Sequence, residues 1–312
     1  MKVYRSLDEI GHLMDTIVTS GTFDGVHLGH IKILERLVAL AKLEKKETVV
    51  ITFWPHPRFV LSKEKEPIGL LSSLEEKLLV FQSLGIDHIL VIPFTLEFSK
   101  LTSNEFVTNI LVNILGVEKL VIGYDHKFGQ NREGSFEYLQ AHAHEYGFEV
   151  EEIPQQDIDD VGISSTRIRK ALEVGDVALA ARYLGRDYAL KGTVIQGKQL
   201  GRTIGFPTAN IQVDEPHKLI PLDGVYAVRV KIDNQRVDGM MNIGFRPTVN
   251  GLSRTIEVNL FDFDRDIYGK EVKVYFVDRI RDEKKFKGLD ELTQQLTLDK
   301  IASLRLLKEK GD

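Results

Sequence analysis

The 312-residue sequence contains no cysteine, so it can form no disulfide, no thiolate metal site and no cysteine nucleophile. This absence fits a reducing compartment, and we expect a cytoplasmic protein. No apolar run reaches the roughly 18 residues that a membrane span requires. The first residues, from Met1 to Ser6, also lack the apolar segment of a signal peptide. We therefore expect a soluble protein without a membrane partner.

A broad basic surface is missing as well. The net charge is −5 at pH 7, and no long run of lysine and arginine occurs, which argues against a nucleic-acid partner. Hydrophobic residues make up 43% of the chain and charged residues 28%, as in an ordinary globular protein. A chain of this length exceeds what one hydrophobic core usually serves, so we expect two domains. The sequence does not indicate the oligomeric state.

The first half of the chain alternates buried strands with amphipathic helices. Continuous apolar or β-branched runs predict strands at residues 17–18, 48–53, 88–92, 118–122 and 148–153. Two of the intervening helices follow capping-box spacings, which are Ser72 or Ser73 with the glutamate three residues later, and Thr102 with Glu105. This alternation predicts a parallel sheet of right-handed βαβ units, with ligands bound beyond the carboxyl ends of the strands.

A glycine-rich turn joins the first predicted strand to the first helix. Residues 21–30 read Gly-Thr-Phe-Asp-Gly-Val-His-Leu-Gly-His. Such a junction presents backbone N–H groups and the positive end of the helix dipole to an anion. His27 and His30 are three residues apart, so they lie on the same side of a helical turn. The pattern predicts a phosphate site, whose candidate residues are Gly21, Phe23, Asp24, Gly25, His27 and His30.

Three further clusters follow the ends of predicted strands. They occupy residues 52–57, 123–129 and 163–169. In the last cluster, the Ser-Ser-Thr run at 164–166 is good N-cap chemistry for the helix that follows. Arg167 and Arg169 nevertheless stand in the first turn of that helix, where positive charge opposes the helix dipole. A phosphate bound at this helix end would explain both features.

The character of the sequence changes near residue 185. From there to residue 280 the apolar segments are short and β-branched, and turn residues separate them, which is typical of an antiparallel barrel. The chain then ends in a helix whose expected apolar face carries Leu289, Leu292, Leu296, Ile301 and Leu304. We expect an α/β fold, with a Rossmann-like parallel-sheet domain in residues 1–185. A β-barrel domain with a terminal helix would follow in residues 186–312.

A second glycine-rich stretch opens the barrel domain. Its glycines and proline are Gly192, Gly197, Gly201, Gly205 and Pro207. Glycines allow a loop to close over nucleotide phosphates through backbone N–H groups. The hydroxyl of Thr208 and the amide oxygen of Asn210 are hard oxygen ligands, suited to Mg²⁺ that is held jointly with ATP phosphates. The stretch therefore predicts a Mg²⁺–ATP site.

Together these motifs resemble one family. Those of the first half, in order, resemble the FMN adenylyltransferase module of bacterial bifunctional riboflavin kinase/FAD synthetases, and residues 192–210 resemble the riboflavin kinase signature of the same enzymes. The resemblance implies that ATP phosphorylates riboflavin to FMN, with Mg²⁺ as the cofactor. A second ATP then adenylylates FMN to FAD and releases pyrophosphate. The implied partners are riboflavin, FMN and ATP.

The resemblance also implies roles for single residues. His27 and His30 would be catalytic in adenylylation, and Glu257 would be the general base for the ribityl 5′-hydroxyl. Many relatives carry a histidine two residues after this glutamate, whereas this chain has Asn259, so we expect no Glu–His pair. Further implied nucleotide-binding residues of the adenylyltransferase are Asp125, Ser164, Ser165, Thr166 and Arg167. The implied flavin-binding residues are Pro55, His56, Pro57, Phe128, Asn242, Arg281 and Phe286.

Two alternatives remain open on the sequence alone. The first is a nucleotidyltransferase for another phosphorylated acceptor that carries a vestigial barrel, although Thr208, Asn210 and Glu257 are all intact. The second is a flavin-binding regulator or an OB-like nucleic-acid module. The acidic net charge and the lack of interleaved basic and aromatic residues disfavour the nucleic-acid version.

Overall fold

The computed structural model describes residues 1–62, 68–124, 126–154, 162–197, 200–248 and 251–311. The chain forms two compact units, Met1–Ser165 and Thr166–Asp312. We expected a boundary at residue 185. The division falls earlier because helix α9 (Val177–Leu184) packs against strand β12 (Glu271–Arg281) of the second unit. The N–H of Leu222 also donates to the carbonyl of Leu172 at 2.9 Å.

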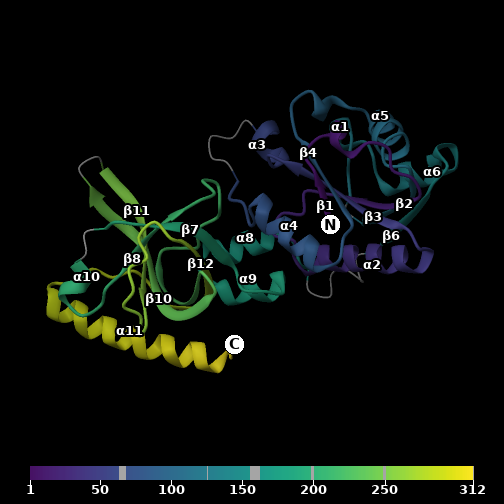
Figure 1. The fold of residues 1–312 in the computed structure, drawn as a ribbon. Helices are drawn as coiled ribbons and strands as arrows, with labels where there is room; N and C mark the ends of the chain where they lie inside the picture. The colour runs from purple at the N-terminus through teal and green to yellow at the C-terminus, as the bar shows by residue number, and fades with distance from the viewer. Residues whose placement is uncertain (63–67, 125, 155–161, 198–199, 249–250, 312) are drawn as a thin grey trace. The chain divides into compact units, whose positions relative to one another are not determined.

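The first unit is built on a parallel sheet of six strands in the order β1-β4-β3-β2-β5-β6 (Figure 1). The five strands predicted from the sequence are present, and the parallel sheet is confirmed. The sixth strand, β1, was not predicted, because its three residues form only a short edge that pairs with β4. The strands are β1 (Lys2–Tyr4), β2 (Thr16–Ser20), β3 (Glu47–Trp54), β4 (His88–Pro93), β5 (Val117–Gly123) and β6 (Glu149–Ile153).

Helices cover both faces of this sheet. They are α1 (Leu7–Ile10), α2 (Leu28–Glu44), α3 (Pro57–Leu61), α4 (Leu74–Ser83), η1 (Phe98–Lys100), α5 (Ser103–Phe106), the π-helix η2 (Val107–Val112), η3 (Gln130–Arg132) and α6 (Phe136–Tyr146). Leu34 of α2 and Phe81 of α4 belong to the core on one face, and Leu139 of α6 belongs to the core on the other. Figure 1 shows the sheet between these two helical layers. Consecutive strand residues alternate between the two cores, as Ile17 and Val18 do.

Capping residues begin two of these helices as predicted. Ser73 and Glu76 form a reciprocal capping box at the start of α4, and Thr102 and Glu105 form another at α5. Ser72 has the same spacing from a glutamate, but its hydroxyl accepts a hydrogen bond from the N–H of Gly25 at 2.9 Å. The first of the two neighbouring serines therefore contacts the glycine-rich turn, and the second caps the helix.

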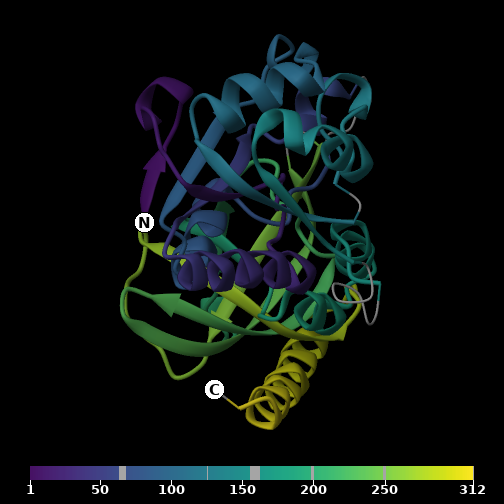
Figure 2. The same cartoon turned by 90° about the vertical axis from the view of Figure 1, so that its right-hand side faces the viewer.

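The second unit is a closed antiparallel barrel in the order β10-β11-β8-β7-β12-β9. The predicted barrel with a terminal helix is therefore confirmed. Its elements are α8 (Ser165–Glu173), which starts at the boundary, α9, β7 (Ala189–Ile195), α10 (Leu200–Thr203), β8 (Ala209–Val213), β9 (Gly224–Ile232), β10 (Gln235–Thr248), β11 (Gly251–Leu260), β12 and α11 (Leu289–Glu309). Figures 1 and 2 show α11 as a long yellow helix alongside the barrel, where it packs on β9, β10 and β12.

The face of α11 that packs on the barrel matches the predicted one only in part, since Leu296 packs against a core of the barrel and Leu292 is half-buried. Leu289, Ile301 and Leu304 are exposed, whereas Asp299, Ser303 and Leu307 are buried. The prediction was wrong for Leu289, Ile301 and Leu304 because polar contacts orient the helix. Asp299 accepts hydrogen bonds from the guanidinium of Arg281, and the carbonyl of Leu307 accepts one from Arg229 at 2.7 Å.

Candidate active sites

The glycine-rich turn of the first unit has an unusual backbone. Residues 21–27 connect β2 to α2, and three of them have positive φ, which are Phe23 at 47°, Gly25 at 83° and Val26 at 39°. Positive φ is uncommon for residues other than glycine and is strained for a β-branched one, at a cost of about 1–3 kcal/mol. Such strain persists only where surrounding contacts fix the backbone, and it concentrates at functional sites.

Asp24 supplies the contacts that fix this turn. Its buried carboxylate accepts hydrogen bonds from the N–H of Leu71 and the N–H of Ser72, both at 3.1 Å. The carboxylate therefore ties the turn to the segment that precedes α4. The described side-chain contacts of Asp24 are thus made to the protein itself. Gly21 ties the turn to strand β3, since its N–H donates to the carbonyl of Ile51 at 3.0 Å.

The two predicted catalytic histidines lie together at the start of α2. His27 is the N-cap residue, and its Nδ1 accepts a hydrogen bond from the N–H of His30 at 3.3 Å. This bond assigns the ring proton of neutral His27 to Nε2. The two rings stack with centroids 3.6 Å apart, and the ring of Phe23 meets His30 edge-on at 5.2 Å. The arrangement places two imidazoles where the helix dipole favours an anion.

One hydrogen bond joins the last motif of the first unit to this turn. The hydroxyl of Ser165 donates to the carbonyl of Asp24 at 2.9 Å, so residues 141 positions apart come together. Ser164 also belongs to the first unit, whereas Thr166 and Arg167 are exposed residues at the start of the second. Asp125, the predicted adenosine contact, lies outside the described residues.

The predicted flavin-binding residues of the first unit fall into two places. Pro55 and His56 connect β3 to α3, and Pro57 is the first residue of that helix. His56 caps the helix by accepting a hydrogen bond from the N–H of Arg58 at 3.1 Å. Phe128 lies elsewhere, against the core of the opposite sheet face, with its ring centroid 5.5 Å from that of Phe106. The described contacts of the Phe128 ring are packing contacts, and its backbone pairs with Gly134.

The predicted residues of the kinase site come from four strands but occupy one row across the barrel. Glu257 on β11 pairs with Asn242 on β10 and with Asn210 on β8. Asn242 and Arg281 on β12 both pair with Val225 on β9. Directly paired residues point to the same face of a sheet, with Cβ atoms about 4.5–5.5 Å apart. The row therefore gathers the predicted general base, one metal ligand and two flavin residues.

Contacts around Glu257 extend this row to the glycine-rich stretch. The buried carboxylate of Glu257 accepts a hydrogen bond from the hydroxyl of Thr208, with Oγ1 and Oε2 3.4 Å apart. The side-chain amide of Asn259 donates to the carbonyl of Pro207 at 2.7 Å. Asn259 thus holds the backbone next to Thr208, a role that the sequence did not indicate.

Close approaches of other residues explain two of the glycines. A Cβ atom at Gly201 would lie 2.1 Å from the carbonyl oxygen of Phe206, which is a backbone atom and cannot move aside easily. A Cβ atom at Gly197 would lie 2.0 Å from the Asn210 side-chain nitrogen. Gly197 therefore lies directly against a predicted metal ligand. Gly192 pairs with Val213 in the strands, and Gly205 turns with a φ of 79°.

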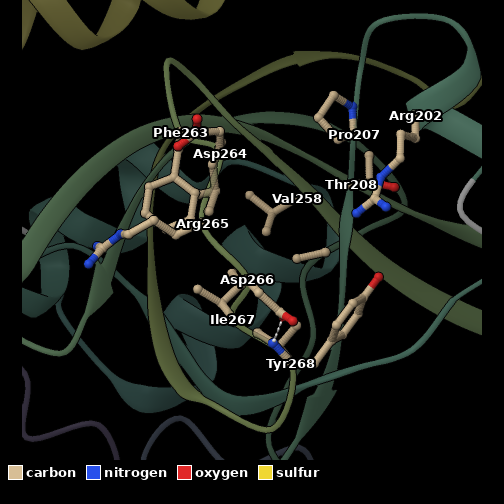
Figure 3. A pocket seen from close by; sticks show the side chains of 13 residues that line it. Arg202, Pro207, Thr208, Val258, Phe263, Asp264, Arg265, Asp266, Ile267 and Tyr268 are labelled. Atoms are coloured by element: carbon tan, nitrogen blue, oxygen red, sulfur yellow. Dashed lines mark hydrogen bonds between the residues drawn. The ribbon is translucent and has the colours of Figure 1, made fainter.

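A cavity of about 260 Å³ lies beside Thr208 (Figure 3). Its walls include Arg202, Pro207 and Val258 and the segment that connects β11 to β12. That segment, residues 263–268, contributes six lining residues, and within it the carboxylate of Asp266 accepts a hydrogen bond from the N–H of Tyr268 at 3.0 Å. We did not predict this segment from the sequence. Its mixture of aromatic, acidic and basic residues in one short turn was the available signal.

Arg281 and Phe286 lie near the end of β12. The guanidinium of Arg281 donates to both carboxylate oxygens of Asp299, at distances from 2.7 to 3.1 Å, and it lies 5.7 Å from the centroid of the Phe286 ring. The side-chain amide of Gln295 donates to the same carboxylate at 2.9 Å. Helix α11 thus positions the residues predicted to contact the flavin.

The donor set fits a metal that is shared with a nucleotide. Among the described residues, no group of three or more histidine, cysteine, aspartate or glutamate residues could hold a metal by itself. Thr208 instead adjoins the cavity, and Asn210 lies in the same row as Glu257. Neutral hydroxyl and amide oxygens suit Mg²⁺ when phosphate oxygens and water complete its coordination.

Comparisons with known proteins agree with this geometry. The FAD synthetase family model matches residues 10–167, and the riboflavin kinase model matches residues 184–307. The bifunctional riboflavin kinase/FMN adenylyltransferase of Escherichia coli (strain K12) is 37% identical over 97% of both chains. That of Haemophilus influenzae is 40% identical over 96% of this chain and 97% of its own. The chain belongs to the bifunctional riboflavin kinase/FMN adenylyltransferase family.

One solved structure resembles this chain over nearly its whole length. A protein from Streptococcus pneumoniae, described as a macrolide-efflux protein, is 33% identical and superposes with a TM-score of 0.88, over 97% of this chain and 98% of its own. Its description concerns that protein alone. In the part of the chain that the structure describes, no helix is both long enough and apolar enough to cross a bilayer.

Family membership decides between the alternatives that the sequence left open. A vestigial barrel is not favoured, because the barrel matches the riboflavin kinase model. A flavin-binding regulator is not favoured either, because both halves match enzyme domains. This family member is an enzyme of flavin cofactor biosynthesis with a riboflavin kinase domain and an FAD synthetase domain.

Proposed function

We propose that the barrel transfers the γ-phosphoryl group of ATP to riboflavin, and that the first unit transfers the AMP group of a second ATP to the resulting FMN. The products are ADP and FMN in the first reaction, and pyrophosphate and FAD in the second. The row of Arg281, Asn242, Glu257 and Asn210 carries the proposal for the barrel. In this row the proposed base has a proposed metal ligand on one side and proposed flavin residues on the other.

In the kinase reaction, Glu257 accepts the proton of the ribityl 5′-hydroxyl as that oxygen attacks the γ-phosphorus of ATP. The bond from that phosphorus to the bridging oxygen breaks, and ADP leaves. Thr208 and Asn210 would hold Mg²⁺ with the ATP phosphates, and the ion would offset the phosphate charge. The hydrogen bond from Thr208 keeps the Glu257 carboxylate in place. Most of the rate enhancement then comes from positioning and charge stabilisation.

In the adenylyltransferase reaction, a phosphate oxygen of FMN attacks the α-phosphorus of ATP, and pyrophosphate leaves. No side-chain nucleophile is needed, because the substrate supplies one. His27, His30 and the N-terminus of α2 stabilise the charge on the triphosphate. Ser164, Ser165, Thr166 and Arg167 hold its β- and γ-phosphates. Pro55, His56 and Pro57 bind the flavin.

The test is to incubate the purified protein with riboflavin, ATP and MgCl₂ and to separate the flavins by chromatography over time. We expect FMN to form first and FAD to follow, with one ADP and one pyrophosphate released for each FAD. Omission of MgCl₂ in the presence of EDTA should stop both steps. Riboflavin that is bound but not converted would refute the proposal. Only small molecules take part, so neither nucleic acid nor membrane is required, and the cytoplasmic location is part of the proposal.

A further inference from the structure

Lys77 is a buried charged residue that neither reaction accounts for. It lies on the first turns of α4 with only 3% of its surface exposed. Lysine side chains on helices normally extend to place the ammonium group in water, and a buried charge costs several kcal/mol unless it is compensated. The contacts of its ammonium group therefore need an explanation.

The Lys77 ammonium group contacts two of the predicted site motifs. Its Nζ donates to the carbonyl of Thr22 at 3.1 Å and to the hydroxyl of Thr52 at 3.3 Å. The Thr52 hydroxyl in turn donates to the same Thr22 carbonyl at 3.3 Å. The Nζ also lies 5.3 Å from the centroid of the Trp54 ring, a cation–π distance. Thr22 belongs to the glycine-rich turn at residues 21–27, which we call the phosphate turn. Thr52 and Trp54 are on β3 and lead into residues 55–57, which we call the flavin loop.

The positive charge of Lys77 also acts on the carboxylate of Asp24. Asp24, the anion of the phosphate turn, is buried and interacts electrostatically with Lys77. Burial lowers the pKa of Lys77 to about 8, and Asp24 acts in the opposite direction. A carboxylate next to a triphosphate site repels the ligand, so a fixed cation behind the turn offsets that repulsion.

We infer that Lys77 is a positioning residue of the adenylyltransferase site, which holds the phosphate turn and the flavin loop in register and offsets the charge of Asp24. The inference rests on the proposed function of the first unit. Reaction requires the FMN phosphate and the ATP α-phosphorus to meet in line, and a displacement of about 1 Å can cost 10²-fold in rate. Lys77 contacts both segments that would present these groups, so it determines their separation.

Lys77→Met tests the inference, since methionine keeps an unbranched chain and removes the charge and the donors. We expect the single-turnover rate of FMN adenylylation to fall about 10²-fold, with FMN and ATP dissociation constants changed less than threefold. Riboflavin phosphorylation in the same sample should stay at the wild-type rate. Trp54 is the only tryptophan, so its emission should shift when the ammonium group is removed. Lys42→Met on α2, at an exposed position, is the matched control and should change none of these.

A second variant separates positioning from loss of folding. Lys77→Gln keeps an N–H donor without the charge. We expect its rate of FMN adenylylation to be about tenfold higher than that of Lys77→Met. Adenylylation by Lys77→Met within threefold of wild type would overturn the inference and leave the proposed function intact. Equal loss of both activities with a lower unfolding temperature in both variants would also overturn it. A wild-type protein that cannot adenylylate FMN would overturn the proposed function itself.

Discussion

Thr208 donates a hydrogen bond to Glu257 across 3.4 Å, from the segment before β8 to the middle of β11. The bond links the proposed metal ligand to the proposed base. Glu257 lies between Asn210 and Asn242 in the row, so its backbone is paired with both neighbouring strands. A substitution at Glu257 should therefore lower the rate of riboflavin phosphorylation more than it alters the structure of the site.

We expect Glu257→Gln to lower the rate of riboflavin phosphorylation by about 10²–10⁴, the usual contribution of a general base. Glutamine keeps the shape and can still accept the Thr208 bond, so the riboflavin dissociation constant should change little. Rapid-quench single-turnover kinetics and riboflavin titration measure the two quantities. Glu271→Gln, at an exposed glutamate of the same barrel, is the matched control. Retention of more than about a tenth of the rate would exclude a base role.

Replacing either stacked histidine should separate the two activities. We expect His27→Ala and His30→Ala each to slow FMN adenylylation by about 10²–10³, the cost of removing one preorganised charge-stabilising donor. Riboflavin phosphorylation should continue, so FMN should accumulate in a chromatographic time course. His144→Ala, at an exposed histidine of the same unit, should convert riboflavin fully to FAD. If both activities fall together, the histidines support folding instead.

The barrel should work without the first unit, and the boundary should matter for its stability. We expect a fragment of residues 166–312 to make FMN and no FAD. A fragment of residues 186–312 should also make FMN but unfold more easily, because it lacks the buried side chains of Val177 and Leu184 that α9 contributes. Two such side chains stabilise by about 3–6 kcal/mol. Urea unfolding of both fragments measures the difference, and equal stability would contradict the packing of α9 on the barrel.

The first unit should lose stability in mild acid through His126. Burial, with Arg132 and Lys127 nearby, lowers the pKa of His126 from 6.5 to about 4. The unfolded chain therefore binds a proton at a higher pH than the folded one, so stability falls as the pH drops from 6.5 to 4. At pH 5 this cost is about 2 kcal/mol relative to pH 7. Urea unfolding followed by Trp54 fluorescence should show a smaller acid loss for His126→Gln. Parallel pH curves for variant and wild type would disprove the role.

Local signals predicted the features that depend on local chemistry. Glycine at positive φ, the capping pairs of Ser73 and Thr102, and a histidine pair at a helix start are all properties of adjacent residues. The sequence could therefore place the phosphate turn and its helix. It could not reveal that Asp24 binds the segment before α4, because that contact spans 47 positions.

Contacts between residues that are far apart in the sequence could not be predicted. Lys77 reads as an ordinary surface lysine of an amphipathic helix, and only the folded chain brings Thr22 and Thr52 to its ammonium group. Asp299 likewise reads as a solvent-facing residue of α11, yet it is buried against Arg281. Hydrophobic periodicity assumes that a buried side is apolar, and this assumption placed the exposed Leu289, Ile301 and Leu304 wrongly on the buried face of α11.

The row across the barrel also restricts how the chain can change in length. Side chains alternate between the two faces of a strand, so one inserted residue reverses the direction of every side chain beyond it. An insertion within β11 before Glu257 would turn this carboxylate away from Asn242 and Asn210, which it now faces. An insertion at the Asp233–Asn234 turn between β9 and β10 would lengthen only the turn, and the two strands could still pair in the same register. Length variation tolerated by evolution in this unit should therefore collect in such turns, while β8, β10 and β11 keep a constant number of residues.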